Sequence, residues 1–153
     1  MDNKTSSVPK DFNKDENKSD NTRLSIISRS IGIMESHGKY REAVGLCELI
    51  HNDQRAITNM VRAGLFMDAE RKAAQKGLER TLARAYEKTG HSSNAISSYI
   101  RCGLTQEAIR LCEQTQQFDI ASCICMDTER HDDAQTYAQI HQAIKTSVNR
   151  RTV

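Results

Sequence analysis

The chain has 153 residues, with 22 lysines and arginines and 20 acidic residues, which give a formal net charge of +2. It contains five cysteines and one proline. This length corresponds to one domain, and so small a net charge indicates nothing about partners. No apolar run approaches the roughly 18 residues of a membrane span, and the first residues, Met-Asp-Asn-Lys, are not typical of a signal peptide. We therefore expect a cytoplasmic protein without an integral membrane segment.

The first part of the chain is polar. Residues 1–22 are dominated by Asp, Asn, Lys and Ser, and Val8 and Phe12 are the sizeable apolar residues after the first methionine. Burying so few apolar side chains cannot offset the entropy lost on ordering the backbone. We predict a disordered leader over residues 1–22, helical repeats over residues 23–148 and a short basic tail over residues 149–153.

The rest of the chain repeats with a period of 13 residues. One apolar residue, nearly always alanine, recurs at this spacing as Ala43, Ala56, Ala69, Leu82, Ala95, Ala108, Ala121 and Ala134. Five residues before each of these stand Gly38, His51, Gly64, Gly77, Gly90, Gly103, Gln116 and Glu129. A period of this length fits one helix of about ten residues followed by a tight turn, which predicts stacked antiparallel helices.

Each recurring residue type has a structural reason. Glycine enters the left-handed conformation that ends a helix without the steric cost of a Cβ, so Gly38, Gly64, Gly77, Gly90 and Gly103 are the expected repeat turns. Alanine one turn into each helix lets neighbouring backbones approach closely. A weaker period of 26 residues places Tyr40, Phe66 and Phe118 at helix entries, with Ser92 breaking the pattern. The predicted fold is an all-α, tetratricopeptide-like α-solenoid of hairpins about 26 residues long, shorter than the 34 of the tetratricopeptide motif.

The cysteines follow the same register. Cys47, Cys102, Cys112 and Cys125 lie four or seven residues after a repeat position, where a small buried side chain is expected. We predict reduced core thiols. Cys123 and Cys125 together with His131 resemble a zinc pattern, but the two thiols would point to different sides of one helix. We therefore expect no metal and no cofactor.

The sequence contains no Gly-rich phosphate loop, no Gly-x-Ser-x-Gly motif and no His-Glu-x-x-His motif, so we expect no enzyme and no small-molecule substrate. Basic residues gather in residues 55–84 without interleaved aromatic residues, which favours a solvated helix face over a nucleic-acid site. Acidic residues gather in residues 113–133. Such an asymmetry could steer the end-to-end association of solenoids.

The two ends of the repeat array are the expected binding surfaces, because each repeat buries its faces only against its neighbours. At the first helix, apolar residues exceed what one face can bury, and Ile27 and Ile31 are the candidate interface residues. A longer final helix offers Tyr137 and Ile140, either as a cap or as a docking surface.

Part of the repeat array resembles a known family. Residues 82–87 read Leu-Ala-Arg-Ala-Tyr-Glu, Ala95 and Ile96 follow after Gly90, and residues 108–112 read Ala-Ile-Arg-Leu-Cys. These segments, in this spacing, resemble the solenoid of the large WD-repeat subunits of intraflagellar transport complex A. The resemblance covers residues 82–112 and extends more weakly back to about Gly38. It implies a scaffold in retrograde ciliary transport and ciliary cargo entry, in the cilium or flagellum and at the basal body, with other solenoid and WD-repeat subunits as partners.

Two other functions are compatible with the same pattern. Short solenoids of this type also occur in coat and tethering complexes of vesicle traffic, and a free-standing solenoid can serve as an adaptor or chaperone. The chain also lacks the WD propellers of the ciliary family, so their contacts cannot be transferred to it. The sequence leaves these alternatives open.

Overall fold

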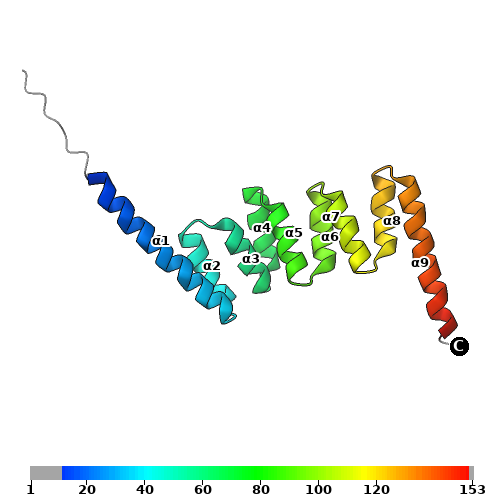
Figure 1. Ribbon diagram of the computed structural model, residues 1–153, viewed down its shortest axis with the longest axis horizontal. Coiled ribbons are helices and arrows are strands. Elements are labelled where there is room, and N and C mark those ends of the chain that lie inside the picture. Colours follow the sequence, from blue (N-terminus) through cyan, green and yellow to red (C-terminus); the bar gives the residue numbers. More distant parts are fainter. Residues whose placement is uncertain (1–11, 152–153) are drawn as a thin grey trace, which may run out of the picture.

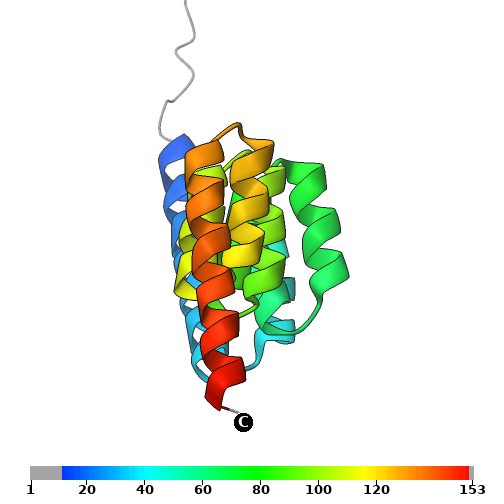
Figure 2. The ribbon, with the colours of Figure 1, turned by 90° about the vertical axis from the view of Figure 1, so that its right-hand side faces the viewer.

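A computed structural model describes the backbone of residues 12–151 and the side chains of residues 19–148. The described part of the chain is all-helical and lies in a row, with α1 and α9 at opposite ends (Figure 1). Figure 2 looks along this row from the α9 end. The elements are α1 (Phe12–Ser36), α2 (Tyr40–Leu49), α3 (Asp53–Arg62), α4 (Phe66–Lys76), α5 (Glu79–Lys88), α6 (Ser92–Arg101), α7 (Thr105–Gln114), α8 (Phe118–Asp127) and α9 (His131–Arg151). Each helix packs against the next in sequence, and α3 also packs against α5. The predicted α-solenoid of helical hairpins is thus confirmed.

The turns between helices share one geometry. Every residue five positions before a repeat position has a positive φ, including the three that are not glycine, His51, Gln116 and Glu129. The backbone N–H of the residue after it donates to the carbonyl five residues earlier, as from Leu65 to Met60 at 2.8 Å. This bond is typical of the Schellman motif, which satisfies carbonyls left free at a helix end. Each of the helices from α2 to α9 then begins three residues before its repeat position.

The repeat positions are buried along the whole row, in two core clusters. All eight residues from Ala43 to Ala134 in the 13-residue register are at most 2% exposed. Larger side chains one to four positions further on fill the space between helices, including Ile57, Tyr86, Ile96 and Leu111. At the entry of α4, Phe66 packs against the rings of Tyr86 and His91, with centroids 5.7 and 4.8 Å apart. Burial against neighbouring helices therefore stabilises helices that would be too short to form alone.

The end helices extend further than the sequence pattern predicts. α1 begins at Phe12, so the structure places residues 12–22 of the predicted leader in this helix, while residues 1–11 lie outside the described part. α9 runs to Arg151, so residues 149–151 of the predicted tail belong to this helix, while residues 152–153 lie outside the described part. A helix anchored by packing propagates at little cost into flanking residues that lack a breaker. No helix within the described residues is both long and apolar enough to cross a membrane.

Candidate interaction surfaces

Carboxylates at one register position join non-adjacent helices. Three glutamates lie five residues after a repeat position, and Glu35 lies five residues after Ser30, which is 13 residues before Ala43. Each of the four accepts a hydrogen bond from a side chain on a later helix. The pairs are Glu35 with Arg55 and Asn59, Glu48 with Lys72, Glu87 with Tyr99 and Arg110, and Glu113 with Tyr137. Three of the four connect an odd-numbered helix to the next odd-numbered helix. We call these four pairs the glutamate clamps.

The Glu35 clamp is the most elaborate. Arg55 donates to both carboxylate oxygens of Glu35, at 2.9 and 2.7 Å, and Asn59 donates to the same carboxylate at 2.8 Å. Asn59 is fully buried, and its amide NH2 replaces lost water by donating to Glu35 and, weakly, to Cys47 Sγ at 3.7 Å. The hydrogen bond from Arg55 lowers the pKa of Glu35, because it stabilises the charged carboxylate.

We expect Glu35→Ala to lower the free energy of unfolding by about 1–3 kcal/mol, because the buried Asn59 amide keeps only the weak sulfur acceptor of Cys47. Since the pKa of Glu35 is lowered in the folded state, its ionic contribution is complete above the ordinary carboxylate pKa of about 4.3 and is lost as the pH falls through the lower folded-state value. The melting temperatures of the wild type and Glu35→Gln should therefore converge in acid. Glu42→Gln, at an exposed carboxylate of α2, is the matched control. A constant difference down to pH about 3 would contradict this prediction.

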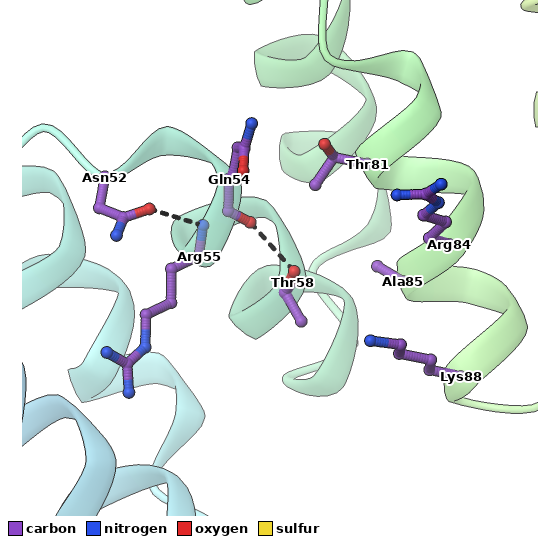
Figure 3. Close-up of a pocket in the computed structure, with 8 residues that line it drawn as sticks. All are labelled: Asn52, Gln54, Arg55, Thr58, Thr81, Arg84, Ala85 and Lys88. Atoms are coloured by element: carbon purple, nitrogen blue, oxygen red, sulfur yellow. Dashed lines mark hydrogen bonds between the residues drawn. The ribbon is translucent and has the colours of Figure 1, made fainter.

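A hollow of about 360 Å³ lies between α3 and α5 (Figure 3). Figure 3 shows Arg84 and Lys88 on α5 reaching toward α3, whereas the guanidinium of Arg55 turns away from α5. Neither Arg84 nor Lys88 forms an ion pair within the described residues, and no acidic residue lines the hollow. The surface is therefore positively charged and shallow. It offers cations and hydroxyl groups, among them that of Thr81, but no arrangement of acid, base and nucleophile.

The first end of the row differs from the expectation. Ile31 is fully buried against Ala43 and Cys47, and Ile27 is partly buried beside them, so Ile31 is not an interface residue. The reason is its register: Ile31 lies one residue after the extrapolated repeat position, Ser30, where α2, α3, α5, α6 and α7 also bury an apolar side chain. The exposed apolar residues of α1 are instead Leu24, Ile26 and Ile33, which are 47, 59 and 55% exposed.

The last end of the row is partly capped. Where the internal helices carry a buried Ile57, Ile96 or Ile109, α9 carries the exposed polar residue Gln135. Polar outer faces are typical of terminal repeats in solenoids. Tyr137 is partly buried, stacks on Phe118 and donates to Glu113, so it belongs to the packing. Beyond it, α9 leaves further apolar residues exposed: Ile140, Ile144 and Val148.

The cysteines divide as their register predicts. Cys47, Cys112 and Cys125 are fully buried, Cys102 is partly buried and Cys123 is exposed. Burial raises the pKa of the Cys112 thiol to about 11, because the thiolate loses its hydration. Cys123 and Cys125 do lie on different sides of α8, and the described residues contain no cluster of three or more metal-ligand side chains.

Under native conditions, we expect an alkylating reagent to modify Cys123 quickly and Cys47, Cys112 and Cys125 slowly, because reaction requires an accessible thiolate. Mass spectrometry of peptides after timed quenching measures the modification rate of each cysteine. In denatured protein, all of these cysteines should react at similar rates. Rapid modification of Cys112 in the folded protein would mean that its helix face is not packed as described.

Comparisons of the chain with protein-family models, with curated proteins and with solved structures give no match. The interaction surfaces therefore have to be interpreted from their own geometry. Sequence reasoning found the repeat register and the long final helix, but it missed the glutamate clamps. The signal was present in the 13-residue register, since Glu35, Glu48, Glu87 and Glu113 all occupy one position in it.

Proposed function

We propose that the chain is a non-enzymatic scaffold for protein–protein interactions and that it binds its partners through the two ends of the helical row. The observation that supports this most directly is the contrast between the ends and the interior. Five internal helices, α3 and α5 to α8, bury the residue three positions after the repeat position, whereas its counterpart Ile33 on α1 is 55% exposed. Ile140 and Ile144 are likewise exposed on α9, where no further helix follows within the described residues. Exposed apolar side chains grouped in this way are typical of protein interfaces.

The resemblance of residues 82–112 to the large WD-repeat subunits of intraflagellar transport complex A supports a more specific proposal. On this proposal, the chain assembles with other solenoid and WD-repeat subunits in the cilium, where the complex acts in retrograde transport and cargo entry. The glutamate clamps favour such a role physically, because they add hydrogen bonds from α1 to α3, from α5 to α7 and from α7 to α9, which stiffen these parts of the row. A rigid spacer suits a subunit that must contact two partners at once.

Affinity capture of the tagged chain from ciliated cells tests this proposal, and we expect WD-repeat subunits of complex A to be recovered. Ile26→Asp with Ile33→Asp, or Ile140→Asp with Ile144→Asp, should reduce recovery about tenfold or more, because each pair places charges in an interface. Met67→Asp on α4, where Met67 is 85% exposed, is the matched control and should change nothing.

Recovery of coatomer or tethering-complex subunits would instead favour a role in vesicle traffic. Equal recovery from the wild type and both end variants would contradict binding through the ends. Circular dichroism of each variant separates a lost interface from a lost fold, since all four isoleucines have exposed side chains.

A further inference from the structure

The first helix presents the same contact face that α3 uses inside the array. Arg55 and Asn59 of α3 lie one residue before and three residues after a repeat position, and both bind Glu35 of α1. Shifting this pair back by the 26-residue hairpin period leads to Arg29 and Ile33 on α1. These two residues therefore occupy the register positions whose side chains, in α3, bind Glu35 of α1.

On α1, no other helix of the described residues covers this face. Arg29 is exposed and forms no hydrogen bond or ion pair within the described residues, whereas its counterpart Arg55 forms a two-bond pair with a carboxylate. Ile33 is 55% exposed, whereas its counterparts Asn59, Ala85 and Ser98 are at most 1% exposed. Ile26 lies on the same side, three residues before Arg29 and seven before Ile33, and is 59% exposed. One helix face thus combines two uncovered apolar residues with an unpaired cation between them.

We propose that this face of α1, formed by Ile26, Arg29 and Ile33, binds an amphipathic partner helix that carries a glutamate or aspartate beside its apolar stripe. This inference rests on the proposed scaffold function and specifies the chemistry of one partner. The partner helix packs on this face of α1, with its carboxylate accepting from Arg29, as Glu35 accepts from Arg55, and its apolar residues covering Ile26 and Ile33. The two-bond arrangement of Glu35 with Arg55 provides the internal precedent. Arg is well suited to such a contact because its planar guanidinium matches a carboxylate at two points.

Charge distinguishes this occupant from the alternatives. A basic amphipathic helix would bring a like charge onto Arg29, which opposes binding. The α9 helix of a second copy is another possible occupant, because it exposes isoleucines. At the position where the glutamate clamps carry glutamate, however, α9 carries the uncharged Gln139, which offers Arg29 no carboxylate. The favoured partner therefore combines an apolar stripe with negative charge.

Fluorescence anisotropy of the full chain with two synthetic helical peptides tests the proposal. Both peptides carry leucine along one face, and the flanking positions are glutamate in one and lysine in the other. We expect the wild type to bind the leucine–glutamate peptide at least about tenfold more tightly than the leucine–lysine peptide. Arg29→Glu should reverse this preference, and Ile33→Asp should weaken binding of the leucine–glutamate peptide about tenfold.

Two controls separate this face from other surfaces. Arg41→Glu makes the same charge change on α2, and Arg84→Glu makes it in the hollow between α3 and α5, so neither should alter the preference. Equal affinity for the two peptides, an unchanged preference in Arg29→Glu, or a reversal in Arg84→Glu would overturn the proposal. So would self-association of the free chain that sedimentation detects and Ile33→Asp abolishes, because a second copy would then cover the face.

The outcome is independent of the cellular test. Peptide binding at α1 with no complex A subunit in the affinity capture would keep this inference and refute the ciliary role. If complex A subunits are captured, recovery is lost only in the Ile140 and Ile144 variant, and no peptide binds at α1, the ciliary role is kept and this inference is refuted.

Discussion

Ala108→Arg should unfold most of the helical row, lowering the free energy of unfolding by at least about 3 kcal/mol. Ala108 is fully buried in a core cluster that consists of apolar side chains, where an added charge meets no carboxylate of the cluster. Burying an unpaired charge costs several kcal/mol, and the added volume forces the helices apart. Thermal unfolding followed by circular dichroism at 222 nm is the measurement.

Ala74→Arg is the matched control, because Ala74 lies on α4 but is exposed. Arginine and alanine have similar helix propensities, so this variant should melt within a few degrees of the wild type. Similar melting temperatures for Ala108→Arg and Ala74→Arg would show that the 13-residue register does not define the buried positions.

Gly103→Val should lower the free energy of unfolding by about 1–3 kcal/mol, which is more than an ordinary change of helix propensity. Gly103 has a φ of +71°, and a Cβ added there would meet no atom within 4 Å. The expected cost is therefore conformational rather than a steric clash with neighbours, because a β-branched residue strongly disfavours the left-handed region. Gly64→Val, at a φ of +75°, should behave alike.

Gly45→Val controls for the change of side chain. Gly45 lies inside α2 without a positive φ and also has open space around its Cβ position, so valine should be neutral or slightly stabilising there. The converse replacement, Gln116→Gly, should stabilise the fold modestly because Gln116 has a φ of +58°. Destabilisation of Gly45→Val and Gly103→Val by the same amount would contradict the turn geometry.

The sequence was sufficient to predict the repeat geometry. Turn residues and packing residues recur every 13 positions, and each has a local reason: a helix end needs a left-handed residue, and a close helix contact needs a small one. These requirements depend on neighbours a few residues apart or on the adjacent helix. For this reason even Gln116 and Glu129, which are not glycine, were placed correctly by their register, and both have positive φ.

The same local reasoning predicted the separation of the thiols. Helical periodicity alone places Cys123 and Cys125 on different sides of α8, and one is exposed while the other is buried. The likeness to a ciliary transport family also came from sequence, and it remains a proposal about function. No geometric feature of the described residues depends on that likeness.

Only the tertiary structure decided which residues about 12 to 24 positions apart contact one another. By register, Ile31 and Ile33 correspond to Ile57 and Asn59, both of which α3 buries, so the repeat period alone does not say which of the two stays exposed at the end of the row. Only the positions of α2 and α3 show that Ile31 is buried and Ile33 is exposed. In the same way, Glu35 becomes a clamp only because α3 brings Arg55 within 2.7 Å. Local backbone preferences act over one turn of helix, whereas side-chain pairing between helices depends on how the hairpins stack.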